Sequence, residues 1–146
     1  MSRKPPATRA EFKEWRSMTT RWADNDAYGH VNNTVYYEWF DSAVNAWMVE
    51  RGMLDIEHGD PIALVVETRC TYAAPLAFPQ PVEIGLAVAE LGRSSIRYRI
   101  GIFPEGAEGA AAEGELRCRF RRRGARGGRL AGRHAPGCLP PRTPER

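Results

Sequence analysis

The chain has 146 residues, which is enough for one domain with its own hydrophobic core. Its apolar fraction of 42% is ordinary for a soluble protein, and no apolar run approaches the length of a membrane span. The three cysteines are odd in number and widely spaced, which argues against a disulfide framework and a zinc site. Since residues 1–16 show no secretory signal pattern, we expect a cytoplasmic protein that needs no metal and no cofactor.

The net charge of +3 conceals an asymmetry, because residues 117–146 contain ten arginines and a single acidic residue. The overall charge is therefore no argument for nucleic-acid binding, although the basic end alone could bind polyanions non-specifically. Composition divides the chain into a polar lead-in (1–14), a folded domain (15–121) and an Arg/Gly/Pro-rich tail (122–146). We expect the lead-in to be loose, and the tail to be either disordered or the product of a frame change in a GC-rich gene.

Hydrophobic periodicity predicts one long helix and five strands. The helix, residues 33–51, carries apolar side chains at helical spacing, with Asn32 and Asn33 as N-cap candidates and Gly52 just beyond its end. Alternating or β-branched patterns predict the strands 15–22, 62–72, 82–91, 95–103 and 113–121. The last four strands follow one another through short connections, which predicts antiparallel pairing of successive strands. The predicted class is α+β, with the helix packed on one sheet and apolar helix surface left for a subunit contact.

The stretch before the helix gathers groups that suit acyl chemistry. It reads Asp24-Asn25-Asp26-Ala27-Tyr28-Gly29-His30-Val31-Asn32-Asn33. Carboxylates, an imidazole and the free N–H groups of a helix N-terminus thus occur within about ten residues, where a base and an oxyanion donor could act together.

The motif Asp24-x-Asp26-x-x-Gly29-His30-Val31-Asn32-Asn33 resembles that of hot-dog-fold acyl-CoA thioesterases of the 4-hydroxybenzoyl-CoA thioesterase type. Two later segments, Tyr72-x-x-Pro75-Leu76 and Leu91-Gly92-Arg93-Ser94-Ser95, resemble strand regions of the same family, so the resemblance covers roughly residues 16–103. It implies a hot-dog fold, in which a five-stranded antiparallel sheet wraps around one long central helix. It also implies hydrolysis of an acyl-CoA to a carboxylic acid and CoA, dimers or tetramers with active sites at a subunit interface, and no metal.

By motif position, the resemblance maps the catalytic carboxylate to Asp26 and the oxyanion donor to the backbone N–H near Asn33. Asp26 could act as a nucleophile or as a general base on water, and Gly29 would let the backbone approach the thioester closely. His30 could polarise the carbonyl or position water, but a loop histidine bonded to backbone remains equally open. For Asp24 we favour a structural role.

Further site residues lie later in the chain. Arg93, Ser94 and Ser95 fall where members of the family often contact the coenzyme A portion of the substrate. Tyr36 is expected chiefly to pack and could also contact the acyl group. Glu67 is either a second carboxylate from a partner subunit or an ordinary strand-face residue.

Two other functions stay open at this point. One is a hot-dog binding module without catalysis, whose basic tail binds polyanions. The other is an enoyl-CoA hydratase, which the spacing disfavours. Such hydratases carry Asp-x-Asn-Pro-x-His, whereas Asp26 and His30 are only four positions apart and no proline intervenes.

Overall fold

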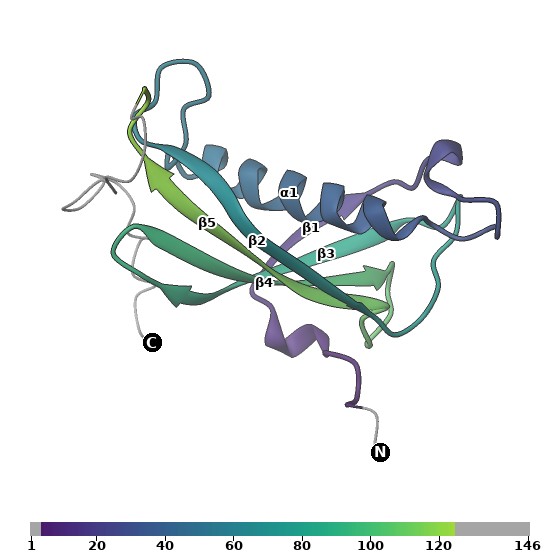
Figure 1. Cartoon of the computed structure of the whole chain (residues 1–146). Coiled ribbons are helices and arrows are strands. Elements are labelled where there is room, and N and C mark those ends of the chain that lie inside the picture. The colour runs from purple at the N-terminus through teal and green to yellow at the C-terminus, as the bar shows by residue number, and fades with distance from the viewer. Residues whose placement is uncertain (1–3, 125–146) are drawn as a thin grey trace.

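The computed structural model describes residues 4–124 as one sheet and one long helix. The elements are β1 (Glu14–Met18), α1 (Asn33–Glu50), β2 (Ile62–Tyr72), β3 (Val82–Leu91), β4 (Ser95–Pro104) and β5 (Ala112–Arg121). Two 3-10 turns, η1 (Arg9–Glu11) and η2 (Trp22–Asp24), flank β1. The five strands pair antiparallel in the order β1-β3-β4-β5-β2, and the sheet curls around α1 (Figure 1). The predicted α+β class and five-stranded sheet around a central helix are confirmed.

The helix has the predicted extent because both of its ends carry the expected signals. Asn32 is the N-cap, and its side-chain Oδ1 accepts from the Thr34 N–H at 3.0 Å. Gly52 follows the helix with φ +67°, a left-handed conformation that favours glycine. The buried face of α1 packs on the inward side chains of β3, β4 and β5. That face consists of Val35, Tyr36, Trp39, Phe40, Ala43, Val44, Trp47 and Met48.

The expected pairing of successive strands is wrong at one place. β2 does not pair with β3 but lies at the far edge of the sheet, where it pairs with β5 from Ile62–Arg121 to Tyr72–Ala112. The nine-residue connection 73–81 is long enough to carry the chain across the sheet, and the Val31 N–H donates to its Leu76 carbonyl at 2.7 Å. The first strand is also shorter than predicted, because the chain turns after Met18 into η2.

The N-terminal lead-in packs on the outer face of the sheet, so the expectation that it is loose is wrong for residues 4–14. Phe12 joins Phe103 in a second apolar cluster with Ala7 and Ala110. Gly85 and Gly101 leave room for it, since a Cβ at either position would lie 2.8 Å from the Phe12 ring.

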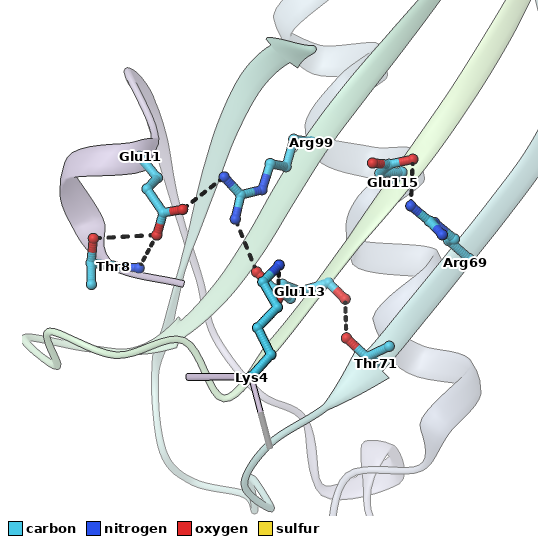
Figure 2. Close-up of polar contacts among 8 residues, drawn as sticks. All are labelled: Lys4, Thr8, Glu11, Arg69, Thr71, Arg99, Glu113 and Glu115. Atoms are coloured by element: carbon cyan, nitrogen blue, oxygen red, sulfur yellow. Dashed lines mark hydrogen bonds and ion pairs between the residues drawn. The ribbon is translucent and has the colours of Figure 1, made fainter. Parts of the chain in front are cut away.

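Ion pairs fasten the same segment to the strands (Figure 2). Glu11 pairs with Arg99 at 2.9 Å, and Arg99 also pairs with Glu113 at 3.1 Å. Lys4 reaches Glu113 from the other side at 3.4 Å. Non-local contacts of this kind leave no periodic signal in the sequence, which explains why composition alone suggested a loose segment.

From residue 125 onward the basic tail lies outside the described residues, so its expected disorder stays a prediction. Its first residues follow β5, where Arg123 contacts the connection between α1 and β2. The Arg123 Nε and Nη2 donate to the carbonyls of Gly59 and Ile56, both at 2.6 Å. Within residues 4–124, no helix is both long and apolar enough to cross a membrane.

Candidate active site

Asp26 lies in a tight turn directly before α1. The Asp26 N–H donates to the His30 carbonyl at 2.9 Å, and the Gly29 N–H donates back to the Asp26 carbonyl at 3.0 Å. Gly29 closes this turn with φ +82°, a conformation that residues with a Cβ rarely adopt. The carboxylate Oδ1 accepts from the Tyr28 N–H at 2.9 Å. The Asp26 carboxylate, half-buried, has no ion-pair partner in the described part of the chain.

Asp24, two residues earlier, is used by the fold instead. Its side chain is 1% exposed. It accepts from the Arg21 N–H at 2.7 Å and from the Arg21 Nε at 2.9 Å. Its carbonyl accepts from the Asn32 N–H at 2.8 Å, which ties the turn to the start of α1. These contacts agree with the structural role that we favoured for Asp24, and they leave Asp26 as the available carboxylate of the pair.

The N-terminus of α1 presents one backbone donor that the fold does not use. The Thr34 N–H is capped by Asn32, and the Val35 N–H donates to the Asn32 carbonyl at 3.0 Å. For the Asn33 N–H, the structure of residues 4–124 gives no acceptor. This donor lies at the positive end of an 18-residue helix, where the helix dipole favours a developing negative charge.

The carboxylate and the helix end meet at a pocket of about 430 Å³. Its lining residues are Asp26, His30, Val31, Asn32, Asn33, Tyr36, Tyr72, Ala73, Ala74 and Pro75. The structure therefore brings together four of the predicted site residues: Asp26, His30, Asn33 and Tyr36. Gly29 shapes the turn beside them. The His30 side chain is exposed at this pocket, which leaves it accessible to a bound molecule.

Aromatic rings form one wall of the pocket. Tyr36 is 3% exposed, and its ring meets the Tyr72 ring edge to face at 5.0 Å and 89°. Burial, together with the nearby Cys70 thiol, raises the pKa of Tyr36 to about 12, so its phenol is neutral near pH 7. The wall therefore offers apolar surface without a charge.

The other predicted site residues lie elsewhere in the protomer. Arg93 and Ser94 lie in the β3–β4 turn and Ser95 begins β4, at the opposite end of the sheet from the N-terminus of α1 (Figure 1). On β5, Ser95 lies opposite Arg119 and Tyr72 lies opposite Ala112. The seven residues of strand between these two positions span about 23 Å.

Glu67 is likewise outside the pocket of its own chain. It lies exposed on β2, opposite Arg117 at 3.9 Å. Within one protomer, neither Glu67 nor the β3–β4 turn reaches Asp26.

Tyr72 lines the pocket although the sequence offered it only as part of a strand motif. Its hydroxyl donates to the Asn33 carbonyl at 3.1 Å. The only sequence signal for Tyr72 as a pocket residue was its position at the end of a predicted strand. That position indicates the pocket only when the order of the strands in the sheet is known. Within the described range, no group of His, Cys, Asp and Glu side chains is arranged to hold a metal ion.

Comparisons with known proteins identify the family and the fold. The family model described as the thioesterase superfamily matches residues 28–111, which is more than half of the chain. The PA5185 protein from Pseudomonas aeruginosa is similar in structure with a TM-score of 0.83 and 46% identity, over 89% of this chain and 90% of that chain. Among curated proteins, none matches this chain.

Two further solved structures have names that state an activity. A protein from Xanthomonas campestris, provisionally assigned as an acyl-CoA thioesterase, has 28% identity and a TM-score of 0.65, over 73% of this chain and 91% of that chain. The gentisyl-coenzyme A thioesterase BH1999 has 26% identity and a TM-score of 0.68, over 75% of this chain and 89% of that chain. The predicted hot-dog fold and the predicted thioesterase are thus confirmed, and the chain belongs to the thioesterase superfamily.

Proposed function

We propose that this chain hydrolyses an acyl-CoA thioester to a carboxylic acid and free CoA, at the pocket before α1. The observation that carries the proposal is the meeting of an unpaired carboxylate, Asp26, with an unused helix N–H, that of Asn33, in one pocket. Family membership supports the reaction type. The two similar proteins named as CoA thioesterases support CoA as the thiol portion of the substrate.

The chemistry requires a nucleophile on one side of the thioester carbonyl and a donor for its oxygen. As a general base, Asp26 removes a proton from water, the water oxygen attacks the carbonyl carbon, and the C–S bond breaks to release the thiolate. As a nucleophile, Asp26 attacks the carbonyl carbon, the C–S bond breaks to release the thiolate, and water then hydrolyses the resulting mixed anhydride. Oδ2 is the more available oxygen for both routes, because within residues 4–124 only Oδ1 accepts a hydrogen bond, from the Tyr28 N–H.

In either route the carbonyl oxygen becomes negative and needs a donor. The Asn33 N–H serves this purpose, and one such donor typically contributes about 3 kcal/mol to transition-state binding. His30, an exposed residue that lines the same pocket, would polarise the carbonyl or hold the water. The thiolate is a good leaving group, so the reaction does not require a second acid.

We also propose that the active enzyme is a homodimer or homotetramer. β2 is an edge strand of 11 residues, and its Leu64, Val65 and Val66 are 40%, 47% and 46% exposed. An unpaired apolar edge of this length favours pairing with another strand. A second chain would also supply the CoA-contacting β3–β4 turn and Glu67, which lie far from the pocket in their own protomer. Sedimentation equilibrium of the purified chain should give two or four times the mass of one chain, and a monomer would contradict this part.

The cellular setting that we propose is the cytoplasm. Cys70 and Cys118 are free thiols, and Cys118 is buried in the core. Thiols of this kind persist in reducing compartments. Fractionation of the native host, followed by detection of this chain, tests the assignment.

The test of the reaction is a screen of the purified full chain with aromatic, short-chain and long-chain acyl-CoAs, with release of free thiol as the readout. We expect turnover of at least one class, with one thiol and one carboxylic acid formed per thioester consumed. A folded chain that releases no thiol from any class would contradict the proposal. Crotonyl-CoA provides the contrast with a hydratase, since loss of the enoyl absorbance without thiol release would indicate hydration.

A further inference from the structure

Tyr72 connects the end of strand β2 to the first residue of α1. It is the last residue of β2 and pairs with Ala112 of β5, so its backbone is held by the sheet. Its hydroxyl donates to the Asn33 carbonyl at 3.1 Å. Its ring lines the pocket and meets the Tyr36 ring edge to face. The same side chain therefore forms a wall of the site and contacts the residue that carries the unused N–H.

The other contacts that hold the start of α1 involve residues 24–34 and the connection 73–81. The Asn32 side chain caps Thr34, the Asn32 N–H bonds Asp24, and the Val31 N–H bonds Leu76. All three are contacts of a turn or a loop. Tyr72 alone among these partners comes from a strand, so its hydroxyl relates the helix end directly to the sheet.

The position of an oxyanion donor matters because preorganised donors act only when they already point at the developing charge. A misplacement of about 1 Å can cost about a hundredfold in rate. A helix end tends to fray, since its first N–H groups have no partner within the helix. A hydrogen bond from the sheet to the first helical carbonyl opposes that motion.

The hydroxyl of Tyr72 is suited to act as a permanent donor. Desolvation and the neighbouring Cys70 thiol raise the pKa of Tyr72, and contact with Tyr37 acts in the same direction. Because the pKa is raised, the phenol keeps its proton at neutral and moderately alkaline pH. A carbonyl can only accept, so the protonated phenol is the form that makes the bond.

We propose that Tyr72 is a positioning residue for the thioesterase reaction, whose hydroxyl holds the Asn33 residue so that its N–H faces the thioester carbonyl. This proposal rests on the proposed function. It assigns Tyr72 no part in proton transfer.

The test compares Tyr72→Phe with Tyr28→Phe. Both variants lose one phenol oxygen, but Tyr28 is 88% exposed and its side chain makes no contact that ties Asn33 to the sheet. Phenylalanine keeps the ring wall against Tyr36. We expect kcat of Tyr72→Phe to fall about tenfold while KM changes less than about twofold, as the loss of one hydrogen bond predicts. The Tyr28→Phe control should retain both values.

Two further readouts separate positioning from other roles. The shape of the pH–rate profile should be unchanged in Tyr72→Phe, because no titrating group of the reaction is removed; loss of a limb would overturn the proposal in favour of acid–base catalysis. Amide hydrogen exchange of Thr34 and Val35, whose N–H groups are both hydrogen-bonded to Asn32, should become several-fold faster in Tyr72→Phe and not in Tyr28→Phe. Unchanged exchange would overturn the proposal even without an activity assay.

Each negative result contradicts one specific proposal. If the wild-type chain hydrolyses acyl-CoA and Tyr72→Phe keeps its kcat, the inference about Tyr72 fails and the proposed function stands. A rise in KM at constant kcat also overturns it, because Tyr72 would then serve only as a wall. If the wild-type chain releases no thiol, the proposed function fails, and the exchange measurement still decides whether Tyr72 holds the helix end.

Discussion

Two of the polar hollows formed by residues 4–124 use their side chains in opposite ways. The pocket before α1 contains the Asp26 carboxylate, which accepts one backbone hydrogen bond and forms no ion pair with any residue in the described range. A smaller hollow of about 230 Å³ lies on the outer face of the sheet. Its lining residues are Lys4, Arg69, Thr71, Arg99, Glu113, Gly114 and Glu115.

In the outer hollow each charged side chain already has a partner of opposite charge (Figure 2). Arg69 pairs with Glu115 at 3.0 Å, and Arg99 and Lys4 both pair with Glu113. Groups that neutralise one another hold the N-terminal segment on the sheet and have little left to offer a ligand. Asp26, which has no counter-charge among residues 4–124, and the Asn33 N–H, which has no acceptor there, remain available to a substrate. Changes at the first pocket should therefore alter activity, and changes around the outer hollow should alter stability.

The largest expected effect is that of Asp26→Asn on turnover. Asparagine keeps the Oδ1 acceptor for the Tyr28 N–H, so the turn should survive while the base or nucleophile is lost. We expect kcat to fall between about 10²- and 10⁴-fold with an unchanged Tm. Asp55→Asn is a matched control, because its Oδ1 likewise accepts from an N–H two residues on, that of Glu57, at 3.0 Å. Near wild-type turnover in Asp26→Asn would remove Asp26 from the mechanism.

The next effect is on stability, at a glycine beside the outer hollow. A Cβ at Gly114 would lie 2.1 Å from the Arg69 carbonyl oxygen and 2.6 Å from the Phe40 ring. Gly114→Ala should therefore lower the free energy of unfolding by about 3 kcal/mol, through a forced shift of the β2–β5 pairing. Gly109→Ala is the control, since its Cβ would meet only the Pro6 side chain, at 3.9 Å. Urea titrations measure both, and equal stabilities would contradict the packing argument.

Two glycines with nearly the same left-handed backbone conformation sharpen the comparison further. Gly29 and Gly106 have φ +82° and +76°, and a Cβ at either position would meet nothing within 4 Å. Substitution of either glycine by alanine should lower the free energy of unfolding by about 1 kcal/mol, because a residue with a Cβ is disfavoured in the left-handed conformation. Only Gly29→Ala should also lower kcat/KM, because Gly29 closes the Asp26 turn. A loss of activity of equal size in Gly106→Ala would show that strain, and not the turn, determines it.

The smallest expected effect is an acid dependence of stability. Hydrogen bonds from Arg9 and from the Gly106 N–H lower the pKa of Glu83 below its ordinary value of 4.5. A lowered folded-state pKa gives stability that is present above the unfolded-state pKa and is lost as pH falls through the folded one. Glu83→Gln should thus lower Tm by about 2 °C at pH 7, and this difference should shrink as pH falls below the ordinary pKa of 4.5. A pH-independent difference would point to packing instead.

Local patterns predicted much of this structure. The helix bounds followed from apolar spacing with Asn32 and Gly52 at its ends, and β2 and β3 have the predicted limits. Asp26, His30 and Asn33 are neighbours in the chain, so one turn followed by a helix was enough to place them together. Residues whose partners are close in sequence leave a readable pattern.

Contacts between distant segments could not be predicted in this way. The pairing of β2 with β5 depends on which strands compete for the free edge of β5, and the sequence of β2 alone does not indicate which strand it pairs with. The role of Tyr72 depends on that pairing, because only then does the end of β2 lie beside Asn33. The packing of Phe12 depends likewise on glycines in two distant strands.

The measurement that tests the central claim most directly is a structure of the chain with a bound, non-hydrolysable acyl-CoA analogue that retains the carbonyl group. We predict that the carbonyl oxygen lies about 3 Å from the Asn33 nitrogen, with the Asp26 carboxylate facing the carbonyl carbon in the same pocket. A carbonyl bound away from Asn33, or an Asp26 carboxylate that faces away from it, would contradict the account.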